Sequence, residues 1–209
     1  MILSRSIKHG WYYHYKIESE KVSKVKDAGF DDLHSFLYKV RSDRPDHLFN
    51  KGPRSSQMDL SHNLTVEETT HPISQFARMG LESNYYDDNH MNVQMFMLGY
   101  DRGTFAMEVP IWLSQDDAEG YTNILETEEA LTGHIDILRL EEDTIWIWDY
   151  KPKAHTEKTA HFQVALYTIM LHVRTGVPWN NLRCGYFDDK KVFEVSINDV
   201  KGIYDSLKR

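Results

Sequence analysis

Two carboxylates and a lysine lie at the ends of two apolar segments that follow one another in the chain. Asp136 lies in 133–138 (GHIDIL), and Asp149 and Lys151 lie in 145–151 (IWIWDYK). Both segments are rich in Ile, Leu and Trp, a composition typical of strands. The charged link between them predicts a hairpin turn, so the strands would pair and bring Asp136 beside Asp149. Because side chains alternate along a strand, Asp149 and Lys151 share one face.

This set of side chains suits metal-assisted hydrolysis of a phosphodiester bond. Mg²⁺ is often held by one or two carboxylates together with waters and substrate phosphate. A bound metal polarises a phosphoryl oxygen and lowers the pKa of its water. A lysine beside it can orient that water or stabilise the charge that develops on the phosphate. We therefore expect Mg²⁺ or Mn²⁺ as the cofactor.

A third element follows on a predicted helix over 157–174. Gln163 and Tyr167 are four residues apart there and so share one helix face. Together with Gly133-x-x-Asp136 and the run 149–151 (DYK), this order of motifs resembles the PD-(D/E)xK nuclease superfamily. The branch it resembles most is the RecB-like nucleases, which include CRISPR-associated and RecB-type exonucleases. The resemblance covers roughly residues 104–187.

The resemblance implies an α/β fold with a restriction-endonuclease-like core in the order α-β-β-β-α-β. Its central mixed sheet would be flanked by helices. It also implies roles for the motif residues. The metal ligands would be Asp136, Asp149 and the Tyr150 carbonyl, Lys151 would act on the attacking water, and Gln163 and Tyr167 would line the site.

Relatives of this kind also carry a glutamate in an earlier strand, closely followed by a proline. The predicted strand 104–113 contains Glu108 and Pro110 in that arrangement, so Glu108 is the expected third carboxylate. An exposed strand glutamate is the alternative interpretation of this position. Many relatives add a histidine on a preceding helix, and His71 and Glu82 lie where that helix is expected.

The element pattern predicts a single domain over 1–209. Residues 1–64 would form a mainly helical N-terminal extension, with one helix over 23–40. Residues 65–197 would form the core, starting with a helix capped by Thr65. Residues 198–209 would form a last helix capped by Asn198. Apolar spacing over 73–98 predicts one or two helices, with a break at 85–90.

Several classes of protein are excluded by composition. The single cysteine, Cys184, rules out an internal disulfide and the four-cysteine iron–sulfur cluster of several RecB-like nucleases. The absence of a Gly-rich phosphate loop predicts no ATP use. No apolar stretch approaches the ~20 residues that span a bilayer. The segment 1–15 also lacks the apolar core of a signal peptide, so we expect an intracellular protein that does not enter a membrane.

The net charge of −8 argues against a nucleic-acid partner, because affinity for DNA comes largely from Lys and Arg at phosphates. A local basic face can nevertheless coexist with an acidic remainder. DNA is the expected partner, with RNA not excluded and a homo-oligomer possible. The candidate phosphate contacts are Lys153 and Lys158 near the site, and Arg41, Arg44, Lys51 and Arg54 in the N-terminal part. Two alternatives remain open: a non-catalytic relative that binds nucleic acid or protein, and a sheet with ordinary surface carboxylates.

Overall fold

The computed structural model describes residues 1–58 and 63–208. Its strands are β1 (Ile2–His9), β2 (Trp11–Glu18), β3 (Val66–Thr69), β4 (Thr104–Leu113), β5 (Leu131–Glu141), β6 (Thr144–Tyr150), β7 (Leu182–Phe187) and β8 (Val192–Val195). Its α-helices are α1 (Ser19–Asp27), α2 (Asp31–Lys39), α3 (Ile73–Ser83), α4 (Asn89–Tyr100), α5 (Tyr121–Leu125), α6 (Ala160–Thr175) and α7 (Ile197–Leu207). Short 3₁₀ turns lie between several of these elements, including 48–50 and 55–57.

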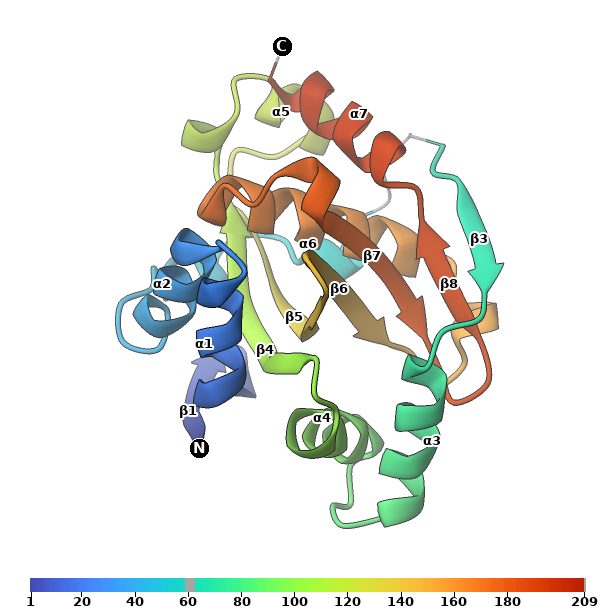
Figure 1. The fold of residues 1–209 in the computed structure, drawn as a ribbon. Helices are drawn as coiled ribbons and strands as arrows, with labels where there is room; N and C mark the ends of the chain where they lie inside the picture. Colours follow the sequence, from blue (N-terminus) through green and yellow to red (C-terminus); the bar gives the residue numbers. More distant parts are fainter. Residues whose placement is uncertain (59–62, 209) are drawn as a thin grey trace.

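All the described strands join one eight-stranded sheet in the order β1-β2-β4-β5-β6-β7-β8-β3. Only β6 and β7 run parallel, and every other neighbouring pair is antiparallel. The parallel pair needs a crossover connection, which α6 supplies. From the α3 and α4 pair to β7, the order is helix, three strands, helix, strand, with the short α5 inserted between β4 and β5, which is the expected restriction-endonuclease-like α/β core. Figure 1 shows this sheet with α6 packed across it and with α3 and α4 together as a separate pair.

The two faces of the sheet bury different side chains because residues alternate along each strand. Ile145 and Ile147 of β6 belong to the larger apolar cluster, which includes most of α6. Trp146, Trp148 and Tyr150 belong to a second cluster with residues of α3 and α4. Asp149 follows the alternation of Ile145 and Ile147, so its carboxylate belongs to the α6 side of the sheet.

The N-terminal segment corrects the expected mainly helical extension. Residues 2–18 form the hairpin of β1 and β2, and β2 pairs with β4 through Lys16 and Ile17. The expected helix over 23–40 is two helices, because Gly29 adopts a φ of 87° between them. Aromatic and polar side chains alternate over the first 18 residues. Such a pattern suits a half-buried strand, and the extended conformation is favoured here because β2 pairs with the core strand β4.

Two further boundaries differ from the sequence prediction. The segment after Thr65 is strand β3, paired with β8, and not a helix start. Helix α7 is capped by the Ser196 side chain, which accepts a bond from the Asp199 amide, and not by Asn198. Strand β4 has the predicted bounds, and α3 and α4 are separated at the predicted break. In the described part of the chain, every helix is too short or too polar to cross a membrane.

Candidate active site

Three carboxylates lie in one row across β4, β5 and β6. The pairs Met107↔Ile137 and Val109↔Ile135 place Glu108 opposite Asp136. The pair Ile137↔Trp148 is the last recorded between β5 and β6 on this side, so Asp136 and Asp149 follow it where the two strands separate. Asp136 accepts a 3.0 Å hydrogen bond there from the Tyr150 amide. The sheet therefore gathers all three predicted acidic residues at one point.

Glu108 reaches this point through an unusual backbone conformation. Its φ is 52°, in the left-handed region that non-glycine residues rarely adopt. Such strain persists where the surrounding structure fixes it and is common at functional sites. The Glu108 Oε1 atom accepts a 2.7 Å hydrogen bond from the Gln94 side chain on α4. Burial, followed by the charge of Asp136, raises the pKa of Glu108 to about 8.

Asp149 is the most enclosed of the three carboxylates. It is 0 % exposed, and neither of its oxygens accepts a hydrogen bond of normal geometry from the described residues. Its Oδ2 atom lies 2.7 Å from Lys151 Nζ. Burial and the charge of Asp136 raise the pKa of Asp149 to about 7, although Lys151 opposes the rise. A buried carboxylate with so few partners is costly, and a bound cation would remove that cost.

Lys151, Gln163 and Tyr167 form a chain of contacts beside Asp149. Lys151 Nζ donates to Gln163 Oε1 at 3.0 Å, and Gln163 Nε2 donates to the Tyr167 hydroxyl at 2.8 Å. Burial alone would lower the pKa of Lys151, but the charges of Asp149 and Asp136 outweigh it and raise that pKa. Lys151 therefore remains a cation, and its position is fixed from the sheet and from α6.

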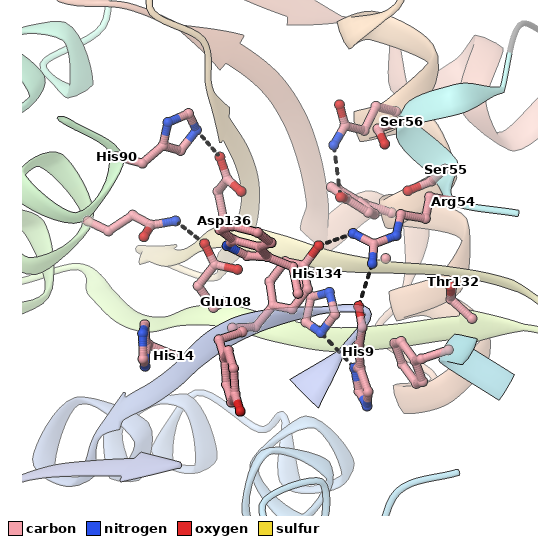
Figure 2. A pocket seen from close by; sticks show the side chains of 18 of the residues that line it. His9, His14, Arg54, Ser55, Ser56, His90, Glu108, Thr132, His134 and Asp136 are labelled. Carbon is pink, nitrogen blue, oxygen red and sulfur yellow. Dashed lines mark hydrogen bonds and ion pairs between the residues drawn. The ribbon is translucent and has the colours of Figure 1, made fainter. Parts of the chain in front are cut away.

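His90 completes the site, and the sequence had not singled it out. It lies in the first turn of α4, and its Nε2 atom is 3.5 Å from Asp136 Oδ2. Burial lowers its pKa, but the Asp136 interaction and the other carboxylates raise it to about 9. Figure 2 shows His90 directed at Asp136, with Glu108 beside them. The sequence does contain Asp88, a residue type that caps helices, two positions before His90. A cap predicts where a helix begins, but it does not predict that this end of the helix lies against the sheet.

The two residues proposed for the histidine-bearing helix lie elsewhere. His71 precedes α3, contacts Glu141 at 3.0 Å and packs 5.0 Å from the Trp148 ring, among side chains of the second apolar cluster. Glu82 is exposed near the end of α3. Neither lines the cavity at the carboxylates. The structure therefore does not bring His71 or Glu82 to the carboxylate row, because the helix that contacts these carboxylates is α4 and not α3.

A cavity of about 380 Å³ opens onto Glu108 and Asp136 of the carboxylate row, and Asp149 lies behind them, fully buried. The residues of the predicted site that line it are Glu108, Asp136, Lys151, Gln163 and Tyr167. The 54–56 segment, which contains the candidate phosphate contact Arg54, also lines it, and so does the N-terminal hairpin, which the sequence did not predict. Lys153 and Lys158 are exposed and do not line it, whereas Arg54 does. The cationic groups at the cavity are thus Lys151, Arg54 and His90, in a chain of net charge −8.

The donor set fits a hard divalent cation that keeps part of its water. Within residues 1–58 and 63–208, no three His, Cys, Asp or Glu side chains are arranged as a ready set of ligands. Mg²⁺ does not need such a cage, since one or two carboxylates, waters and substrate phosphate suffice. Among the described residues, no hydrogen bond reaches Asp136 Oδ1 or Glu108 Oε2, and Asp149 is unsatisfied. Oxygen donors therefore remain free on all three carboxylates.

A family model for the PD-(D/E)XK nuclease superfamily matches residues 34–205, which is most of the chain. The chain belongs to this superfamily. A search of curated proteins found no match. Members of the superfamily are in general nucleases that typically use divalent metals, and the matched span contains the whole carboxylate row and α6. The hairpin of β1 and β2 lies outside the matched span, although it lines the cavity.

The Tyr167 ring packs so closely against Gly133 that no side chain fits at position 133. A Cβ atom there would lie 2.3 Å from Tyr167 Cε1 and 2.7 Å from Ser55 Oγ. We expect Gly133→Ala to displace Tyr167, to lower the free energy of unfolding by about 1–3 kcal/mol and to reduce activity. Thermal unfolding and cleavage rates measure both effects. Gly202→Ala is the matched control, because nothing lies within 4 Å of its Cβ position. Equal behaviour of the two variants would contradict the close packing of Tyr167.

His90 is expected to orient Asp136 rather than to bind metal itself. Its removal by His90→Ala should weaken metal affinity or activity by about 10- to 100-fold, the usual effect of losing a group that orients a metal ligand. The metal concentration that gives half-maximal cleavage is the measurement. His155→Ala serves as the control, since His155 is exposed and does not line the cavity. An unchanged metal dependence in His90→Ala would contradict this role.

The metal-free protein should lose stability as the pH rises. The folded chain holds protons on Asp149 up to about pH 7 and on Glu108 up to about pH 8, whereas the unfolded chain releases them near the ordinary carboxyl pKa values of 3.8 and 4.5. The folded state therefore binds more protons in this range, and stability falls with pH. We expect the unfolding temperature in EDTA to fall between pH 6.5 and 8 by about 4 °C, since 1 kcal/mol corresponds to about 2–4 °C at this chain size. Below pH 6.5 the slope is opposed by His71 and His134, because burial lowers the pKa of each and the unfolded chain then binds the additional protons. Millimolar Mn²⁺ should restore most of the loss at pH 8, and a flat profile in EDTA would contradict the raised pKa values.

Proposed function

We propose that this chain is a metal-dependent nuclease that hydrolyses phosphodiester bonds of DNA, of the RecB-like kind, and that it acts on ends or single strands. The observation that carries the proposal is the row of Glu108, Asp136 and Asp149, with the Lys151 ammonium 2.7 Å from Asp149. Membership of the nuclease superfamily supports the reaction class. The enclosed and unsatisfied Asp149 supports a bound cation.

Glu108, Asp136, Asp149 and the Tyr150 carbonyl would hold Mg²⁺ or Mn²⁺. When bound, the metal supplies Lewis-acid polarisation of the phosphoryl oxygen and lowers the pKa of a water. The residues of the chain then have separate tasks. Lys151 orients the attacking water and stabilises the charge that develops on the phosphate. Gln163 fixes Lys151 through its 3.0 Å contact, and Tyr167 fixes Gln163.

The test is cleavage of end-labelled single- and double-stranded DNA in Mg²⁺ or Mn²⁺, with EDTA as the control. Products that shorten stepwise from an end would support exonuclease action, and internal fragments would replace that part of the proposal. Parallel RNA substrates separate DNA from RNA as the polymer. Cleavage that is unaffected by EDTA would contradict the proposal.

A non-catalytic binding module is the second candidate, and the net charge of −8 is the observation that favours it. Against it, Glu108 is held in a strained conformation beside Asp136, and Asp149 is fully buried beside Asp136, with the Lys151 ammonium at 2.7 Å. A module that only binds would gain nothing from a strained Glu108 backbone and a buried Asp149 carboxylate, both of which lower stability. Binding of DNA without cleavage in any divalent metal would favour this second candidate.

A further inference from the structure

The tip of the N-terminal hairpin presents two large aromatic side chains at the cavity. Trp11 is 75 % exposed and Tyr12 is 59 % exposed, and both line the cavity of the carboxylate row. Of the five tryptophans, all in the described part of the chain, Trp11 alone is exposed. The Lys8 ammonium lies 5.8 Å from the centre of the Tyr12 ring, so a cation stands beside one face of that ring. The hairpin thus places two accessible ring faces near the site.

Arg54 lies under this tip without a carboxylate partner. Its guanidinium donates to the Tyr13 hydroxyl and to the His9 carbonyl, and among the described residues no carboxylate lies within 4.0 Å of it. Gly10 forms the turn with a φ of 71°, and a Cβ atom there would lie 3.1 Å from Arg54 Nη2. Figure 2 shows Arg54 beside His9 and His134, on the side of the cavity away from His90. Arg54 therefore brings a fixed positive charge, with no neutralising partner, to the same cavity.

These two features match the two parts of a nucleotide. A guanidinium binds phosphate oxygens through its planar fork of donors. Exposed aromatic rings stack on the faces of bases in single strands, whatever the sequence. In a duplex those base faces are already stacked on one another, so the same rings have nothing to cover. An aromatic tip combined with an arginine that has no carboxylate partner therefore favours an unpaired strand over a duplex.

We propose that the hairpin tip is a binding site for single-stranded DNA, in which Trp11 and Tyr12 stack on unpaired bases and Arg54 binds a neighbouring phosphate. The inference rests on the proposed function, because the strand held here leads to the carboxylate row in the same cavity. The hairpin would thereby make the protein bind single strands in preference to duplexes. The roles are separable: the rings act by stacking and Arg54 acts by charge.

The experiment measures binding of a fluorescently labelled single strand and of the matching duplex by anisotropy, in EDTA so that no cleavage occurs. The double variant Trp11→Ala/Tyr12→Ala should weaken single-strand binding by at least about tenfold. It should leave duplex binding and the salt dependence unchanged. Arg54→Ala should reduce the slope of log K against log salt by about 0.7, the loss of one phosphate contact on a single strand. Quenching of tryptophan fluorescence by the single strand should disappear in Trp11→Ala.

Tyr100→Ala is the matched control, because Tyr100 is also 75 % exposed but does not line the cavity. Since Arg54 also anchors the hairpin, the tip variant decides the question: its side chains are exposed and their loss does not disturb packing. Equal single-strand affinity of the tip variant and the wild type would overturn the proposal, even if the wild type cleaves DNA. Loss of single-strand binding in the tip variant would support it even if the wild type cleaves nothing, in which case only the proposed nuclease activity fails. A wild type that binds duplex and single strand equally would also overturn it.

Discussion

Asp149→Asn should abolish cleavage and, at the same time, stabilise the metal-free protein. The substitution keeps the shape of the side chain but removes a charge that is fully buried and repelled by Asp136. Loss of a metal ligand should lower activity by at least about 100-fold, the upper end of what is seen for groups that only orient a ligand. Loss of the repelled charge should raise the unfolding temperature in EDTA at pH 8 by about 2–4 °C for each kcal/mol recovered.

The two readouts of Asp149→Asn separate a metal ligand from a structural residue. A carboxylate that served only to hold the fold would lose stability on substitution, with metal present or absent. A ligand should instead lose the stabilisation that Mn²⁺ gives to the wild type. A variant that is both less stable in EDTA and fully active would contradict the assignment of Asp149.

Lys151→Ala should also abolish cleavage, but with the opposite effect on stability. Lys151 is the cation nearest Asp149, and its removal leaves a buried carboxylate beside Asp136. Removing one partner of a buried pair typically costs about 3–5 kcal/mol. We expect of the order of 2 kcal/mol here, because Asp149 can take up a proton instead. Activity should fall by about 100-fold or more, because the variant lacks the ammonium proposed to stabilise the developing charge.

The control for Lys151→Ala is Lys158→Ala, which removes an exposed lysine close in sequence that does not line the cavity. Its activity and unfolding temperature should stay near those of the wild type. The pair of measurements also tests the contrast with Asp149→Asn, because the two inactive variants should shift the unfolding temperature in opposite directions. Shifts in the same direction would contradict the electrostatic roles assigned to Asp149 and Lys151.

The central part of the fold was predictable because its signals are local. The segments around Asp136 and Asp149 are apolar, lie close in sequence and are joined by a charged turn, so their pairing and the meeting of the carboxylates followed. The four-residue spacing of Gln163 and Tyr167 placed both on one face of α6, where they contact one another. Glu108 was located from the proline that follows it, although its left-handed backbone could not be foreseen.

The remaining parts of the site depend on long-range contacts that the sequence pattern does not report. Residues 2–18 are strands because β2 pairs with β4 and β1 pairs with β2, and their alternation of aromatic and polar residues does not reveal these distant partners. His90 was missed because the break before α4 carried no sign that this helix start would approach Asp136. His71 was chosen from its position in the chain, and it packs instead against Trp148. The N-terminal hairpin and α4 thus complete a site of which only the centre was predictable.

The most direct test of the carboxylate row as a metal site is a metal titration of cleavage on end-labelled single-stranded DNA. Wild type and Asp149→Asn are stripped with EDTA, and Mn²⁺ is then added back stepwise to each. We expect cleavage by the wild type to be absent in EDTA and to return with metal, while Asp149→Asn stays inactive at every metal concentration although it is folded. Cleavage by the wild type in EDTA, or equal cleavage by both proteins, would contradict the claim that the carboxylate row holds the metal used for hydrolysis.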